Sequence, residues 1–576
     1  MSSTNSATST LAGDIEPATK NMKGSFADPE KGLARPVYKG EGTEASPYIV
    51  TWQENDPENP MNFSSLKKWL ITLNAAFATL CVAFASSVYS GGIRQMIVFF
   101  NRDIEVLTLG ISLFVLGFAF GPLLWAPFSE QWGRRNIFLI SYFPFVLFNI
   151  GCARAQNIET MLICRFFAGF FGSSPLTNSG GVISDLFNPA QRALGISIFA
   201  LCPFGGPILG PIVGSFIGIT VSWRWVFYIL IIFSFVMFVL GFLNPETYAP
   251  VLLRRKAAKL QKEDGKVYRS QFDLHPMFAA PLPQKMKTAI ARPFVLLFKE
   301  MIVLLMSLYA AFIYGVLYLF FGAIPIVFAQ DRGWSSGVAS LPFIGIGLGM
   351  LCAVIANVFE NKRYVRNLIA AGGSLPPEAR LPLCCLAGVM LPVGLFWFAW
   401  TTQPSVHWIV PVIASFPFGM SMVLVFLTMF SYLIDVYYVF AASALAANAV
   451  LRSLLGFAFP LFTRIMFQRL GTQWALTLLA FLALAFMPIP FIFYYYGERI
   501  RAKSTFAPGH KPAAAPTPAP AAVQPTPSGA TTAAPSEHSV VCEMQDELDV
   551  GEAVDRQDEI AQEKKDGVYR EKDTTA

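Results

Sequence analysis

Residues 130–135 place opposite charges close together between two apolar segments. Glu130 is followed by Gly133, Arg134 and Arg135, at the end of a run that begins at Gly121. Gly133 permits a tight turn, and at a helix end Glu130 can form an ion pair with either arginine. Such a cluster can hold one conformational state of a protein and release it in another. The alternative is a turn whose basic residues only set the orientation of the chain in a membrane.

Arg165 lies within an apolar segment and is a second candidate for chemistry. An arginine inside such a segment is costly and usually faces a cavity or a polar partner, and the alternative is snorkelling of its guanidinium to a bilayer surface. The carboxylates closest to membrane depth are Glu130, Asp185 and Asp435, while the nearest histidine is His407. We therefore predict proton transfer through Arg165 and one or more of these carboxylates rather than through imidazoles. The alternative is that all three are helix-end or loop charges.

Small residues recur at a spacing of four in a third segment. They are Gly206, Pro207, Gly210, Pro211 and Gly214. This spacing produces a flat helical face that lets a neighbouring backbone approach closely, and the prolines kink the helix. The alternative is tight packing with no special role.

These three motifs resemble signatures of the major facilitator superfamily, in the form seen in fungal drug:proton antiporters. The resemblance implies a latch on a cytoplasmic gate at Glu130, Gly133, Arg134 and Arg135, a link between Arg165 and proton coupling, and an antiporter motif of exporters at residues 206–214. Further matches near residues 52–62, 245–250 and 441–462 extend the resemblance over about residues 50–500. A degenerate copy of the first loop, at residues 360–363, weakens the case for gating there. Two six-helix bundles with a central cavity are the implied fold.

Apolar stretches of the length needed to cross a bilayer as a helix, about 18–25 residues, account for most of the chain. Six precede a polar segment and six follow it, at residues 69–90, 106–128, 136–154, 161–183, 194–217, 225–243, 301–328, 341–359, 382–401, 408–434, 443–467 and 474–496. Twelve such segments in series, with so few charges, argue against the buried helices of a large soluble protein. We predict an all-α membrane protein.

The predicted domains follow from these segments. Bundles at residues 66–243 and 301–497 flank a basic cytoplasmic linker at residues 244–300, with disordered cytoplasmic ends at residues 1–65 and 498–576, the latter rich in Pro and Ala and then acidic. Six plus six segments around a long loop also suggest an internal repeat with a substrate site between the halves.

The composition agrees with a membrane protein. Of 576 residues, 54% are hydrophobic and 14% charged, against about 25% charged in a typical soluble domain. The net charge of +6 does not indicate nucleic-acid binding, because Lys and Arg concentrate in the central loop. Basic loops face the cytoplasm, so both termini are expected there, with the plasma membrane as the location. The eight cysteines form no CxxC pair, and neither a metal nor a cofactor is expected.

The expected function is proton-coupled efflux of a small organic solute by alternating access, by a monomer in the lipid bilayer. No Walker sequence is present to bind ATP. A polycation would require a carboxylate deep in a segment, whereas Arg165 and Arg452 lie there, which favours a neutral, amphiphilic or anionic substrate. The candidate cavity-lining residues are Phe170, Asn178, Asn448 and Arg452. The alternatives are proton-coupled uptake and export of polyamines or cationic drugs, and more remotely a membrane acyltransferase or a channel.

Overall fold

The chain divides into two compact units. The computed structural model describes residues 38–53, 55–274, 282–372 and 375–506. One unit comprises Met1–Phe63 with Tyr248–Ala280, and the other comprises Ser64–Thr247 with Pro281–Ala576. The apolar helices belong to the second unit. The predicted disorder of the two ends concerns mainly residues 1–37 and 507–576, which lie outside the described residues.

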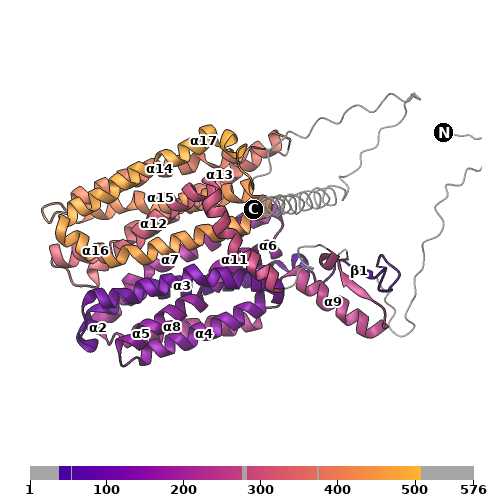
Figure 1. Cartoon of the computed structure of the whole chain (residues 1–576). Helices are drawn as coiled ribbons and strands as arrows, with labels where there is room; N and C mark the ends of the chain where they lie inside the picture. The colour runs from indigo at the N-terminus through magenta and orange to yellow at the C-terminus, as the bar shows by residue number, and fades with distance from the viewer. Residues whose placement is uncertain (1–37, 54, 275–281, 373–374, 507–576) are drawn as a thin grey trace, which may run out of the picture. The chain divides into compact units, whose positions relative to one another are not determined.

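The helices of the first half form one bundle of the larger unit, in the lower part of Figure 1. They are α1 (Ser65–Val88), η2 (Tyr89–Gly92), α2 (Ile93–Phe100), α3 (Ile104–Trp132), α4 (Arg134–Arg154), α5 (Ile158–Gly172), α6 (Ser174–Leu186), α7 (Pro189–Thr220) and α8 (Arg224–Leu243). The α5 and α6 helices form one pass that is interrupted at Ser173, just before Pro175, which occupies the first turn of α6. Proline is well suited to that position because it needs no amide partner there.

The helices of the second half form the other bundle, in the upper part of Figure 1, except for the first of them, which contacts helices of both bundles. They are α11 (Leu282–Lys299), α12 (Met301–Pro325), the π-helical η4 (Ile326–Asp331), η5 (Val338–Ser340), α13 (Phe343–Ala370), η6 (Pro377–Arg380), α14 (Pro382–Thr401), α15 (Ile409–Val436), η7 (Tyr438–Phe440), α16 (Ala441–Phe486) and α17 (Pro488–Arg501). The α16 element is non-helical at Gly471, where φ is 75°. The chain reverses there, because Phe459 before it and Phe486 after it both contact Phe312.

Together these elements make twelve passes within the described residues. Ten segments are individually long and apolar enough to cross a membrane. The interrupted α5–α6 pair adds a further pass, and the segment Ala441–Arg501 contains two passes because of the reversal at Gly471. Six passes fall in each half, as the hydropathy of the sequence predicted.

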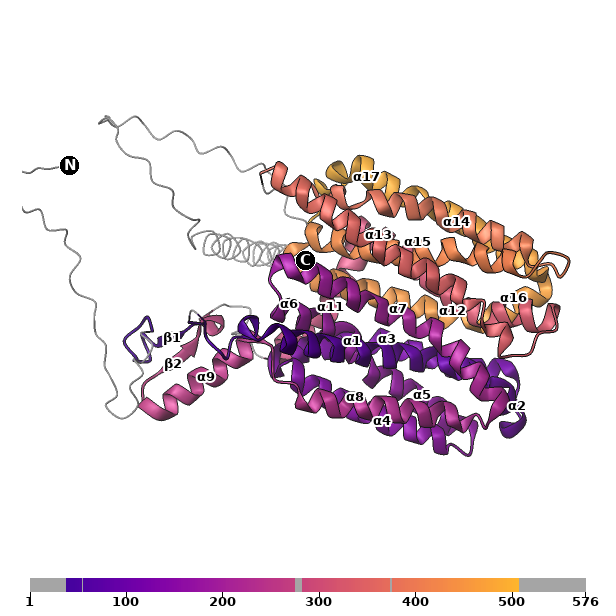
Figure 2. The same ribbon diagram turned by 180° about the vertical axis from the view of Figure 1, so that it is seen from behind.

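The smaller unit differs from the prediction of disorder over residues 1–65. Within it, β1 (Tyr48–Val50) pairs in parallel with β2 (Tyr268–Ser270), and Figure 2 shows both strands beside α9 (Ala249–Asp264). Short helices η1 (Pro60–Asn62) and η3 (Gln271–Leu274) complete the unit. The disorder prediction is therefore wrong for the described residues 38–63, and the expected linker is folded in part.

A small core explains why these polar segments fold. Val50, Leu253 and Ala257 are buried together with Tyr38. The carboxylate of Asp56, which is 6% exposed, accepts a hydrogen bond from Lys256 Nζ at 2.5 Å. The partners come from segments about 200 residues apart, so no local pattern in either segment reveals the pairing.

Candidate functional site

Arg165 is fully buried inside the first bundle. Its guanidinium donates to three backbone carbonyls, those of Gly110 (2.9 Å), Ala85 (2.9 Å) and Ser86 (3.3 Å). It also lies over two rings, 4.8 Å from the centre of Tyr89 and 4.3 Å from that of Phe114. Among the described residues, no carboxylate lies within ion-pair distance of Arg165. Carbonyl dipoles and ring faces therefore stabilise the charge, and the guanidinium does not snorkel to a surface.

The small-residue face of α7 packs directly on α1. A Cβ atom added to Gly206 would lie 2.5 Å from the amide nitrogen of Phe84, and one on Gly214 would lie 2.3 Å from the carbonyl oxygen of Val88. These distances are shorter than any real carbon contact, so only glycine permits this approach. The α1 segment held in this way contains the carbonyls of Ala85 and Ser86 that bind Arg165. The predicted antiporter motif, residues 206–214, thus helps to position the carbonyls that bind Arg165.

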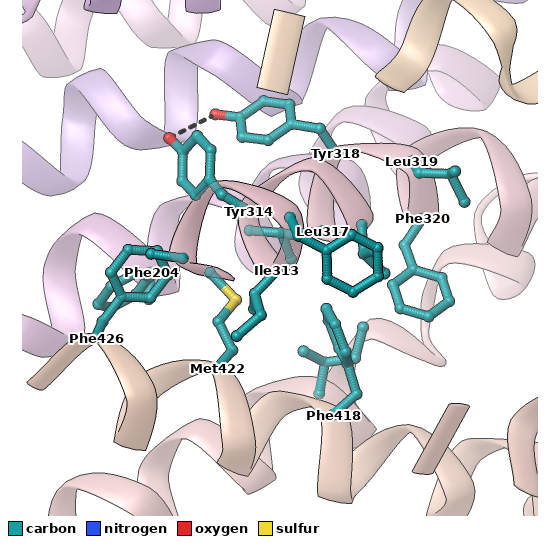
Figure 3. Packing of buried hydrophobic residues seen from close by; sticks show 14 of the residues in the cluster. Phe204, Ile313, Tyr314, Leu317, Tyr318, Leu319, Phe320, Phe418, Met422 and Phe426 are labelled. Carbon is teal, nitrogen blue, oxygen red and sulfur yellow. Dashed lines mark hydrogen bonds between the residues drawn. The ribbon is translucent and has the colours of Figure 1, made fainter. Parts of the chain in front are cut away.

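A polar and aromatic path leads from this segment to the second bundle. The Ser86 hydroxyl lies 2.9 Å from the Tyr318 hydroxyl, which lies 3.4 Å from that of Tyr314. The guanidinium of Arg452, from α16, lies over Tyr314 and Phe426, 4.9 and 5.5 Å from their ring centres. Figure 3 shows the two tyrosine hydroxyls joined and Phe426 beside Phe204. The path joins the surroundings of Arg165 to those of Arg452.

Arg452 and Asn448 have hydrogen-bonding capacity that the protein does not use. Arg452 is half-buried, and its Nε has no hydrogen-bond partner in the part of the chain that the structure describes. Asn448, one turn earlier, is fully buried, and its Oδ1 also has no partner. Within the described part of the chain, no carboxylate lies within ion-pair distance of Arg452. A cation with an unused donor beside aromatic rings can bind an anionic or polar group of a ligand.

An apolar pocket of about 250 Å³ adjoins these rings between the two bundles. Its lining comes from α7, α13 and α15 and includes Leu201, Phe204, Ile208, Gly347, Met350 and Val423. The ring centre of Phe204 lies 5.2 Å from that of Phe426, over which Arg452 lies. The pocket lining itself is apolar, and Arg452 lies next to it on the far side of Phe426 rather than in its wall.

Charged side chains also gather where α3 ends and α4 begins. Arg134 Nε lies 3.5 Å from Asp185 Oδ2 of α6. Glu246, just after α8, accepts the backbone N–H groups of Arg134 (2.8 Å) and Arg135 (3.3 Å), and so places a negative charge at the positive end of α4. Sequence reasoning missed Glu246 as a site residue, although it follows the sixth apolar segment closely. The predicted latch residue Glu130 lies exposed on α3.

Gly133 is required for this arrangement in two ways. Its φ of 94° is one that other residues rarely adopt. In addition, a Cβ atom on Gly133 would lie 2.2 Å from Glu246 Oε2. The turn and the carboxylate contact therefore depend on the same missing side chain.

The second half repeats one of these pairs. Arg380, in the loop between α13 and α14, donates to Asp435 at the end of α15 at 2.6 Å, as Arg134 pairs with Asp185 in the first half. Arg501 at the end of α17 forms two hydrogen bonds with Glu378, at 2.8 and 3.0 Å. Sequence reasoning missed Glu378, Arg380 and Arg501, since nothing in the separate segments that hold Glu378 and Arg501 indicates that they meet.

The predicted proton-coupling residues lie apart. Asp185 binds Arg134 and Asp435 binds Arg380, each at the end of a different bundle, whereas Arg165 binds only carbonyls and rings. Of the predicted cavity residues, Asn448 and Arg452 lie together on α16. Phe170 accepts a hydrogen bond from Trp125 at its carbonyl, and Asn178 donates to Ser174 within α6. Among the described residues, no group of three or more potential metal ligands is present.

Comparison with known proteins gives consistent matches. The model of the family "Major Facilitator Superfamily" matches residues 75–460. The chain is 54% identical over 471 residues to the MFS-type efflux pump MFS2 of Trichophyton rubrum, covering 82% of this chain and 79% of the relative. It is also 54% identical to the major facilitator superfamily multidrug transporter mdrA of Aspergillus fumigatus, covering 82% and 77%. With efflux pump FUB11 of Gibberella moniliformis it shares 47% identity, covering 82% and 79%.

Among solved structures, the chain resembles the proton:xylose symporter XylE. The TM-score is 0.55 at 17% sequence identity, and the alignment covers 75% of this chain and 96% of XylE. At this identity the likeness concerns the fold alone.

Proposed function

This chain belongs to the major facilitator superfamily, and we propose that within it the protein is a proton-coupled exporter of small organic solutes. Membership makes it a transporter rather than an enzyme, with the two-bundle fold that the sequence predicted. Export is supported by the relatives, two of which are named efflux pumps and one a multidrug transporter. It is also supported by the glycine face of α7, which resembles the antiporter motif.

The proposed substrate is an amphiphile that carries a carboxylate or a similar anionic group. The observation that carries this proposal is Arg452, a half-buried cation with an unused Nε donor above Tyr314 and Phe426. Asn448, one turn away, has a buried amide oxygen without a partner among the described residues, and Phe204 extends the apolar wall toward the pocket. The anionic group would bind Arg452 while the apolar part lies against the rings.

Proton coupling is proposed to act at the two Asp–Arg pairs. Protonation of Asp185 or Asp435 would remove the negative charge that holds Arg134 or Arg380 and would loosen that end of the bundle. Arg165 would contribute by fixing α1 against the centre of the molecule. Export that continues unchanged in both Asp185→Asn and Asp435→Asn would contradict a role for these carboxylates.

The proposed location is the plasma membrane, with both termini in the cytoplasm and a monomer as the functional unit. Support comes from the Lys and Arg residues of the central loop, which the positive-inside rule places in the cytoplasm. Epitopes at either end should be labelled only in permeabilised cells. Labelling of intact cells would reverse the proposed orientation.

A binding measurement tests the substrate class. A carboxylated amphiphile and its methyl ester are titrated into the purified protein in nanodiscs. Loss of a charged hydrogen-bonding partner, about 1.5–3 kcal/mol, should lower the affinity of Arg452→Gln for the acid by about 10–100-fold and leave the ester nearly unchanged. Arg469→Gln, at an exposed position on α16, is the matched control. Equal loss for acid and ester, or tight binding of spermidine, would contradict an anionic substrate.

A further inference from the structure

Glu300 is a buried carboxylate that binds residues 504–506, the last residues that the structure describes. It lies directly before α12 and is 3% exposed. Ser504 Oγ (2.6 Å), the Thr505 amide (3.0 Å) and hydroxyl (3.2 Å), and the Phe506 amide (3.2 Å) all donate to it. Residues 504–506, here called the strap, are thereby held against the start of α12 by one side chain.

The strap also contacts the corner between α15 and α16. Tyr437 donates its hydroxyl to Glu300 at 2.8 Å, and burial, together with the Glu300 charge, raises the pKa of Tyr437, so it remains a donor. The ring of Phe506 lies 5.5 Å from that of Phe440. The guanidinium of Arg292, from α11, also lies over the Phe440 ring, 5.0 Å from its centre. The strap therefore connects the end of α17 to the start of α12 and to the α15–α16 corner.

Several basic residues precede Ser504 in the sequence. Arg499 and Arg501 lie five and three residues before Ser504, and Lys503 lies directly before it. Protein kinases with an acidic peptide groove select serines preceded by arginines, because guanidinium groups pair well with carboxylates. Arg499, Lys503 and Thr505 are exposed and Ser504 is half-buried, whereas Arg501 is buried and bound to Glu378. Helix ends open more readily than helix interiors, and for a kinase to bind Arg501 its pair with Glu378 must open together with the contacts to Glu300.

We propose that Ser504 is a phosphorylation site and that its modification releases the strap from Glu300. Ser504 Oγ attacks the γ-phosphorus of ATP bound to the kinase, the bond from that phosphorus to the β–γ bridging oxygen breaks, ADP leaves, and the kinase base takes the hydroxyl proton. The inference rests on the proposed orientation, in which the C-terminal end lies in the cytoplasm with ATP and kinases.

Two physical effects oppose rebinding of the modified strap. The phosphate replaces the hydroxyl hydrogen that Ser504 donates to Glu300. It also brings a charge of about −1.5 to −2 next to a buried carboxylate, and like charges in such a site repel strongly. Phosphorylation thus captures the transient open state.

The test uses the full-length protein in nanodiscs, ATP and a recombinant basophilic kinase. Mass spectrometry locates the phosphate, which should lie on Ser504 and be absent from that position in Ser504→Ala. Hydrogen exchange then reports the strap, because the amides of Thr505 and Phe506 both donate to Glu300. Exchange at these amides should be at least tenfold faster after phosphorylation.

Two variants separate the proposed cause from general effects of charge. Lys503→Glu changes the charge by a similar amount at an exposed neighbour that has no hydrogen bond to Glu300, and its exchange should stay slow. In Glu300→Gln, the amide can donate to the phosphate, so phosphorylation should accelerate exchange much less. The proposal is overturned if Ser504 remains unmodified while a free peptide of residues 496–506 is modified, if exchange is unchanged after modification, or if Lys503→Glu exchanges equally fast. None of these readouts uses transport, so failure of the proposed export would leave them interpretable.

Discussion

Arg165 is accommodated in an apolar helix with no opposite charge within ion-pair distance among the described residues. Its three N–H groups bind carbonyls from α1 and α3, and two aromatic rings cover its faces. A planar guanidinium can reach all these partners at once, whereas an ammonium is a single compact donor. The position therefore selects arginine for its shape as well as its charge.

We expect Arg165→Lys to destabilise the protein despite keeping the charge. Loss of two of the three carbonyl bonds should cost about 1–3 kcal/mol and reduce transport, because α1 loses its anchor. Thermal unfolding in detergent measures the stability. The control is Arg154→Lys, at an exposed helix end. Equal stability of the two variants would contradict the role of the carbonyl bonds.

Glu246 and Glu130 are two candidates for the residue that latches the start of α4. Because Glu246 binds two backbone amides of the first turn, Glu246→Gln should lower stability by about 1–3 kcal/mol. The family resemblance assigns the latch to Glu130 instead. Unfolding and transport of Glu246→Gln and Glu130→Gln, measured side by side, decide between them. A defect confined to Glu130→Gln would favour the assignment from the sequence.

At the scale of elements, the contact between α1 and α7 sets the position of the central groups. The α7 face brings the α1 backbone close enough that Ser87 Oγ donates to the Gly206 carbonyl at 3.3 Å. Ser86, the neighbouring residue, then reaches Tyr318 of the other bundle. A shift between α1 and α7 would therefore move both the Arg165 acceptors and the contact between the bundles.

Two adjacent glycines allow a matched test of this contact. A Cβ atom on Gly206 would overlap the α1 backbone, whereas one on Gly205 would lie 3.7 Å from its nearest neighbour, Leu80. Gly206→Ala should therefore destabilise the protein by about 1–3 kcal/mol and impair transport, while Gly205→Ala, which adds a methyl group at the pocket wall, should leave the stability nearly unchanged. Thermal unfolding and transport assays in the same membranes measure both. Similar behaviour of the two variants would argue against close helix contact as the function of the motif.

The membrane-spanning segments could be predicted from the sequence, but the contacts between side chains of different segments could not. Hydropathy is a local property, so the twelve segments and the glycine face of α7 are visible in single stretches of sequence. The contact between Ser86 and Tyr318 joins residues 232 positions apart, and that between Glu300 and Ser504 joins residues 204 apart. The sequence predicts proton transfer through Arg165 and one or more of the carboxylates near membrane depth, and it does not reveal that Asp185 pairs with Arg134.

At the scale of the whole molecule, the smaller unit responds to pH through Asp56. Burial raises the pKa of this carboxyl, but hydrogen bonds from Lys256 and from the Glu58 amide outweigh burial and leave the pKa below its ordinary value. The folded unit therefore binds this proton less readily than the unfolded chain. The stabilisation is fully present above the unfolded pKa of about 3.9 and is lost as the pH falls through the lower folded value.

Asp56→Asn should thus destabilise the smaller unit at pH 7 by about 1–3 kcal/mol, with a smaller difference from the unsubstituted protein near pH 3. The amides of Tyr48 and Ile49, which bind the carbonyls of Val267 and Lys39, report the unit by hydrogen exchange corrected for intrinsic rates. Glu58→Gln, at a side chain that is 61% exposed and 3.9 Å from Lys256, is the control. If the stability difference between Asp56→Asn and the unsubstituted protein were the same at both pH values, Asp56 would not be the source of the pH dependence.

Transport by the purified protein in proteoliposomes tests proton-coupled export of a carboxylated amphiphile most directly. An antiporter moves protons and substrate in opposite directions, so an acidic lumen should drive the solute into the lumen against its own gradient. Passive permeation of a weak acid concentrates it on the alkaline side instead, and protein-free liposomes measure that background. We predict accumulation in the acidic lumen that a protonophore abolishes and Arg452→Gln reduces. Accumulation in an alkaline lumen above the protein-free level, or transport independent of the pH gradient, would contradict this function.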